Sequence, residues 1–84
     1  MTRRERRARQ VIRRQAHVAL CAVIDMLRDT DAIDRLEENA VLDFIMNAAR
    51  LRANFEDLGF IAAATAAEAL QIALRDELYR RRAA

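Results

Sequence analysis

His17, Cys21 and Asp25 come closest, by residue type and spacing, to a chemical site. They recur every fourth residue, so on a helix they share one side. Zinc accepts all three ligand types, and an imidazole beside a thiol can activate it. Structural zinc usually takes four ligands, however, and cysteine is often a plain buried hydrophobic residue. We interpret the group as packing and predict no metal and no cofactor; a zinc or redox role is the third-ranked hypothesis.

The sequence contains few other residues that could support catalysis. The chain contains no Ser and no Lys, and it has no Gly-rich phosphate loop. Acid–base or nucleophilic chemistry needs a reactive group held beside a polarising partner. We therefore predict no catalytic residues and expect a protein that is not an enzyme.

Arginine dominates the first fourteen residues, where seven of them stand against Glu5 alone. On a helix six of these arginines occupy two adjoining sides: Arg3, Arg7 and Arg14 on one, and Arg6, Arg9 and Arg13 on the other. Guanidinium groups stay charged and fork onto phosphate, which predicts a contact surface for nucleic acid or for a partner. No helix-turn-helix spacing, zipper or aromatic platform accompanies them. A solvated face that keeps an Ala-rich protein soluble remains an equally open interpretation.

An acidic stretch follows in residues 25–43, with seven carboxylates against Arg28 and Arg35. Carboxylates on a rigid helix can occupy a basic groove of a partner. The predicted partner-binding acidic surface is Asp29, Asp31, Asp34, Glu37 and Glu38. Helix caps and first-turn acids explain at least half of these positions equally well.

Helices must position all of these residues. Eighteen Ala, fifteen Arg, a single Gly and no Pro make the chain helical almost by default. Apolar residues recur at three and four along three segments, which predicts helices at about 3–28, 31–58 and 61–82. Short connections make consecutive helices antiparallel. We predict an all-α fold, a three-helix up-down-up bundle in a single domain of residues 1–84.

Helix ends have recognisable signals. Thr2 and Glu5 match a capping box, and Thr30 or Asp31 is the expected cap of the second helix. Gly59 directly follows the last apolar position of that helix, which predicts a left-handed ending there.

Two boundaries remain open. Glu37, Glu38 and Asn39 can divide the second helix into a short piece and a main helix. Thr65 and Glu68 repeat the capping-box spacing, although the third helix can also begin near Ile61.

Charge pairs between helices are expected from this arrangement. The first helix should begin beside Glu56 and Asp57, and Arg80, Arg81 and Arg82 should end beside the acids of the first turn. Within the last helix we expect the pairs Asp76 with Arg80 and Glu77 with Arg81.

The apolar stripes are too broad for three helices to cover. We therefore predict a homodimer, and its dimer or core seam comprises Val41, Ile45, Leu20 and Ile24. The longest uncharged runs reach ten residues, about half of a membrane span. With a single cysteine and no signal-type segment, the expected location is the cytoplasm.

Small size, missing chemistry and uneven charge lead to one first hypothesis. It is a non-enzymatic protein-binding regulator or inhibitor of the kind encoded by phages and mobile elements, blocking a nucleic-acid-handling complex such as a CRISPR effector. The alternative is a nucleic-acid-binding module that uses the Arg-rich face of the first helix.

Overall fold

The computed structural model describes residues 2–84, apart from the side chain of Thr30, and contains four helices in that range. They are α1 (Arg3–Arg28), α2 (Thr30–Asp34), α3 (Glu38–Asp57) and α4 (Ile61–Ala83). The all-α prediction is confirmed. Four helices stand where three were predicted, because the expected helix at 31–58 is divided.

Local side chains cap both α1 and α2, but only the cap of α1 is the predicted residue. Thr2 Oγ1 accepts a hydrogen bond from the Glu5 amide at 3.2 Å, as predicted. The cap of α2 is Asp29, whose carboxylate accepts from the Ala32 amide at 3.1 Å. The prediction of Thr30 or Asp31 as this cap is wrong, because Asp29 ends α1 and begins α2 at once.

The break between α2 and α3 lies at Arg35 to Glu37. Arg35 closes the last turn of α2 through its amide, which donates to the Asp31 carbonyl at 3.2 Å. Glu37 is extended and precedes the first residue of α3. The divided form of this segment is therefore the one that the structure adopts.

The connection from α3 to α4 is a Schellman ending. Gly59 has φ +77°, the left-handed region. Its amide donates to the Glu56 carbonyl at 3.0 Å, and the Phe60 amide donates to the Phe55 carbonyl at 2.8 Å. The predicted stop at Gly59 is confirmed. A cap at Thr65 is wrong, because its hydroxyl donates to the Ile61 carbonyl inside α4.

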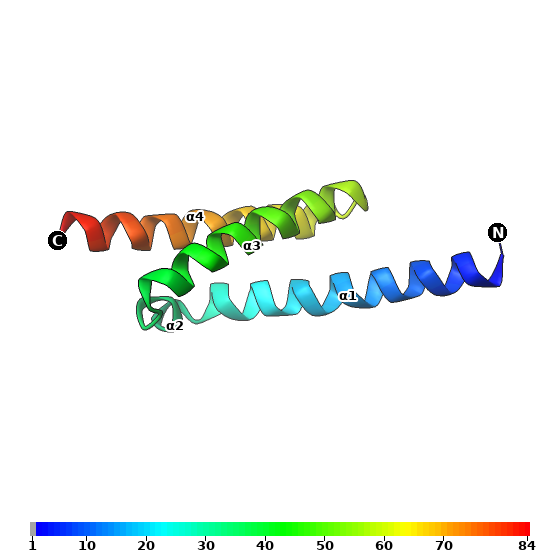
Figure 1. Ribbon diagram of the computed structural model, residues 1–84, viewed down its shortest axis with the longest axis horizontal. Helices are drawn as coiled ribbons and strands as arrows, with labels where there is room; N and C mark the ends of the chain where they lie inside the picture. The colour runs from blue at the N-terminus through cyan, green and yellow to red at the C-terminus, as the bar shows by residue number, and fades with distance from the viewer. Residues whose placement is uncertain (1) are drawn as a thin grey trace.

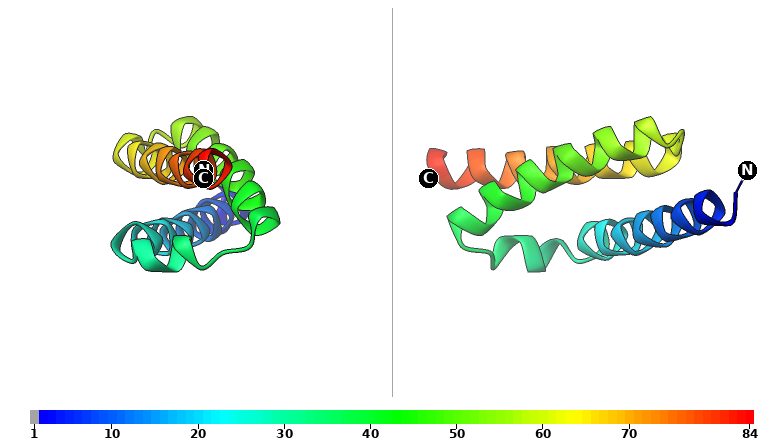
Figure 2. Two further views of the ribbon diagram at one scale, coloured as in Figure 1. Left: turned by 90° about the vertical axis from the view of Figure 1, so that its left-hand side faces the viewer. Right: turned by 45° about the vertical axis from the view of Figure 1, so that its right-hand side comes forward.

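The three long helices alternate in direction, and α2 lies in the turn between α1 and α3 (Figures 1 and 2). Helices α3 and α4 form an antiparallel hairpin, and α1 runs along it. The first turns of α1 continue past the α3–α4 turn, with no helix beside them (Figure 1). The molecule is elongated, measuring 56 × 20 × 18 Å.

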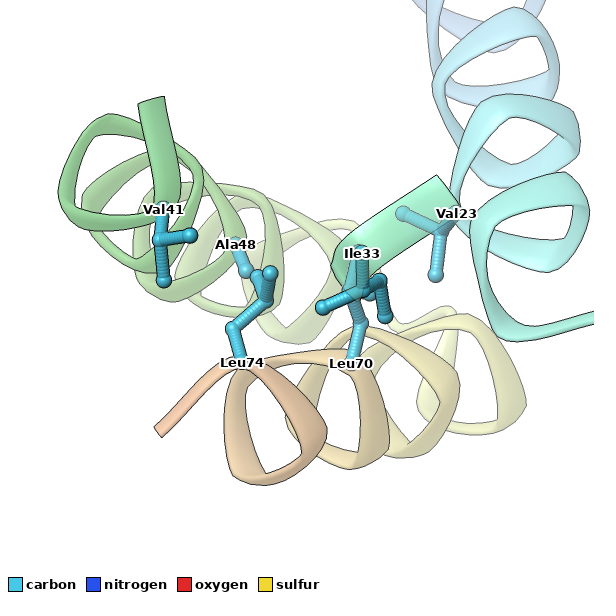
Figure 3. Close-up of a cluster of buried hydrophobic side chains, with 6 residues drawn as sticks. All are labelled: Val23, Ile33, Val41, Ala48, Leu70 and Leu74. Atoms are coloured by element: carbon cyan, nitrogen blue, oxygen red, sulfur yellow. The ribbon is translucent and has the colours of Figure 1, made fainter. Parts of the chain in front are cut away.

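Two apolar clusters hold the helices together. In the first, side chains from all four helices meet: Val23, Ile33, Val41, Ala48, Leu70 and Leu74 (Figure 3). In the second, Phe55 lies among alanines of α1 and α4: Ala16, Ala63, Ala64 and Ala67. Alanine lets the helix backbones approach closely around the Phe55 ring, and Leu20, Leu51 and Phe60 pack against this cluster.

The four residues predicted for the dimer or core seam are largely covered within one chain. Val41 is fully buried in the first cluster. Ile45 and Leu20 are half-buried and pack against the clusters, and Ile24 is half-buried.

Candidate nucleic-acid interface

The first part of α1 stands apart from the body of the protein. We call residues 3–14 the N-terminal arm. Each residue of this arm is exposed, and the first buried side chain of α1 is Ala16. The first turns of the arm extend beyond the end of the hairpin (Figure 1). Near its C-terminal end, Ile12 and Arg13 line grooves shared with the hairpin.

Local sequence explains why the arm is helical without packing. Thr2 caps it, and Glu5 places a carboxylate in the first turn, where the helix dipole favours negative charge. The remaining residues are mostly arginine, with alanine and glutamine, which are strong helix formers.

The arm carries seven guanidinium groups: Arg3, Arg4, Arg6, Arg7, Arg9, Arg13 and Arg14. Twelve helical residues span about 17 Å, so the positive charge is dense. Among residues 2–84 no ion pair or side-chain hydrogen bond joins any of the seven to another residue. The arm is therefore a positive surface that this chain does not compensate.

The acidic residues expected beside the start of α1 lie instead beside the C-terminal end of the arm. Asp57 lines a groove of about 320 Å³ together with Ile12, well past the start of α1. Glu56 pairs with Arg52 of its own helix, at 3.8 Å. The expectation that α1 begins beside Glu56 and Asp57 is wrong, because α1 outreaches the hairpin.

Two grooves flank the C-terminal end of the arm. The first runs between α1 and the end of α3, and the second, of about 560 Å³, runs between α1 and the start of α4. Both are lined by Ala16 and Phe55, and Arg13 lines the second. Apolar surface thus continues from the body onto the arm.

The predicted acidic surface, in contrast, is partly neutralised by arginines of the same chain. Asp34 binds Arg80 at 2.7 Å, Glu38 lies 3.5 Å from Arg82, and Asp29 lies 3.9 Å from Arg35. Asp31 and Glu37 have no ion pair within the described range. The expected proximity of the C-terminal arginines to the first turn is confirmed.

Glu77 is the centre of this C-terminal network, although it is only 7% exposed. Its carboxylate accepts from Arg81 Nε at 2.8 Å and also binds Arg80. The Arg81 bond is the main reason that the Glu77 pKa lies below its ordinary value; partial burial opposes it, and Arg80 adds to it. The expected Glu77–Arg81 pair is confirmed, whereas Arg80 binds Glu77 and Asp34 instead of Asp76.

Sequence reasoning missed the second function of Arg81. Its Nη2 donates to the carbonyls of Ile33 and Asp34, at 3.2 and 3.1 Å. These carbonyls belong to the last residues of α2, and that of Ile33 also accepts from the Leu36 amide at 3.1 Å. Arg81 therefore fastens α2 to α4.

His17 and Cys21 lie on the surface. The Cys21 thiol is 3.7 Å from His17 Nε2, and both side chains are exposed. The interpretation of this pair as core packing is wrong, because both side chains lie off the buried side of α1. His17 lines only the open groove between α1 and the start of α4. Within residues 2–84 no three His, Cys, Asp or Glu residues gather closely enough to hold a metal ion.

Comparison with known proteins adds no assignment. No family model matches the sequence, and no match is found among curated proteins or solved structures. No helix in the described part of the chain has the length and apolar character for a membrane span.

Proposed function

We propose that this protein binds double-stranded nucleic acid through the phosphate backbone, using the N-terminal arm, and that it is not an enzyme. One observation carries the proposal. Seven arginines lie on an exposed helix, and none of them has a partner within the described chain.

The chemistry of the arm favours phosphate over base recognition. A guanidinium group forks onto phosphate oxygens and stays charged at any physiological pH. Stacking on unpaired bases relies mainly on large aromatic side chains, and α1 contains no Phe, Tyr or Trp. A free helix about 17 Å long also fits the major groove of a duplex, which admits an α-helix.

The criterion is whether the charged side chains lack partners within the described chain. By this criterion a protein-binding regulator or inhibitor is the weaker proposal. Its acidic surface has three of five carboxylates paired with Arg35, Arg80 and Arg82. A partner's basic groove would have to displace these arginines. Asp31 and Glu37 alone offer negative charge without competition.

The test is a titration of a short fluorescent DNA duplex at several salt concentrations, read by anisotropy. Arg6→Gln with Arg13→Gln removes two charges from one side of the arm. Each lost phosphate contact should reduce the slope of log K against log salt by about 0.9, so the double variant should lose about 2 from it for each arm that contacts the duplex.

The matched control is Arg50→Gln with Arg75→Gln. It removes the same charge from exposed positions on α3 and α4. This variant should bind like the wild type. Equal losses in both variants, or no binding of the wild type at low salt, would refute the arm as the interface.

The homodimer also stays our proposal for the assembly. A chain of this size buries little apolar surface alone. Large apolar side chains remain exposed on α1, α3 and α4, among them Val18, Met46, Ile72 and Tyr79. A second copy would cover some of them.

A further inference from the structure

A second regular pattern runs along α1, separate from its buried side. Its members are spaced alternately by four and three residues, and all are exposed. We call it the heptad stripe: Arg4, Ala8, Val11, Gln15, Val18, Ala22 and Asp25. Alternation of four and three over 22 residues is the spacing of a coiled-coil seam.

The stripe lies to one side of the face that packs on the hairpin. At 100° per residue its centre is roughly a third of a turn from the buried Ala16 and Val23. Val18 is 68% exposed and Val11 is 53% exposed, so the hairpin covers neither. These are aliphatic side chains at seam positions without a neighbour.

The stripe is complementary to a second copy of itself that runs in the opposite direction. Arg4 stands at one end and Asp25 at the other, with small and aliphatic residues between them and Gln15 in the middle. A parallel copy would set Arg4 against Arg4. An antiparallel copy sets the Arg4 end against the Asp25 end, twice per pair of chains. Neither residue has an ion pair within the described chain.

We infer that a second copy of this chain docks antiparallel along the heptad stripe of α1. Aliphatic and small residues pack between the two helices, and opposite charges meet at both ends. A two-fold axis near Gln15 makes the contact isologous and closed, as in most homodimers. This inference rests on the proposed homodimer but not on nucleic-acid binding.

The docking has a consequence for the arm. Around α1 the stripe lies between the side facing the hairpin and the side that carries Arg3, Arg7 and Arg14. A two-fold axis through the seam therefore puts both hairpins on one side of the α1 pair and the Arg3, Arg7 and Arg14 sides of both helices on the other. The two arms form one continuous basic face.

Light scattering of the purified protein without nucleic acid tests the surface. The wild type should have the mass of two chains, and Val18→Glu should have the mass of one with unchanged helix content. Met46→Glu is the matched control, because Met46 is 64% exposed on α3, outside the stripe. It should remain dimeric. Loss of the dimer in Met46→Glu but not in Val18→Glu overturns the inference.

Cross-linking tests the direction. In a Cys21→Ser background, Gln15→Cys should join two chains through a short bis-maleimide, because Gln15 lies near its symmetry mate. Arg4→Cys should not, because its mate lies at the opposite end. Linkage through both positions shows parallel helices and overturns the inference. A monomeric wild type overturns the homodimer and the docking together, and leaves duplex binding to its own titration.

Discussion

The carboxylate of Glu77 joins two arginines of α4 and, through Arg81, the end of α2. Its pKa is lower in the folded protein than the ordinary 4.5. A carboxyl group with a lowered folded pKa stabilises the fold above its unfolded pKa, and this stability is lost as pH falls through the folded value. Thermal stability should therefore decline as pH is lowered from about 5.

The variant Glu77→Gln separates the contribution of this carboxylate to stability from the effect of low pH on other ionisable groups. We expect a lower melting temperature at neutral pH and a smaller further decline in acid. Glu68→Gln is the control, because its exposed carboxylate lies 3.9 Å from Arg52 and makes no buried contact. It should keep most of the wild-type pH dependence. A Glu77→Gln profile that parallels the wild type at all pH values would contradict the assignment.

Gly59 is the one residue whose backbone requires a particular amino acid. Space is no obstacle, since a Cβ there would meet no atom within 4 Å. At φ +77° an alanine nevertheless costs about 1–2 kcal/mol. Urea denaturation at fixed protein concentration should show that loss for Gly59→Ala and a smaller one for Gly59→Asn, since asparagine tolerates this region. An unchanged midpoint for Gly59→Ala would argue against a left-handed residue here.

At the scale of elements, α2 depends on a side chain from the other end of the chain. Arg81→Met removes the donors to the Ile33 and Asp34 carbonyls and also the bond to the Glu77 carboxylate, and we expect a loss of about 1.5–3 kcal/mol. The amides of α2 should exchange faster in this variant. Arg82→Met removes only an exposed contact with Glu38 and should stay within about 0.5 kcal/mol. Equal effects of the two variants would show that Arg81 does not hold α2.

Helix boundaries that depend on neighbouring residues could be predicted from the sequence. The Thr2 cap and the Gly59 ending involve hydrogen bonds over three to five residues, so their chemistry is visible locally. The separation of α2 is different, because Arg81 binds it from 47 and 48 residues away. No local pattern carries that contact.

The candidate interface likewise has one part that the sequence predicts and one part that depends on the tertiary structure. Periodicity places the arginines on shared sides of α1, because that depends on helix geometry alone. The absence of partners for them within residues 2–84 depends on α1 outreaching the hairpin, which is a tertiary length difference. The exposure of Cys21 has a different origin: the sequence shows its side of the helix but not which side the hairpin covers.

At the scale of the whole molecule, dimer formation and duplex binding should be coupled through the geometry of α1. If the heptad stripes pair antiparallel, the side of each arm that carries Arg3, Arg7 and Arg14 faces the same way, and one duplex meets two arms. The number of phosphates neutralised, and hence the salt dependence of binding, should then be about twice that of a single chain.

Val18→Glu provides the single chain, and Met46→Glu adds the same negative charge to a dimer. In duplex titrations over a range of salt, the slope for Val18→Glu should be about half that for Met46→Glu, because only one basic face remains. Weaker binding should accompany the shallower slope. Equal slopes would mean that each arm binds on its own and that the two basic faces do not lie on the same side.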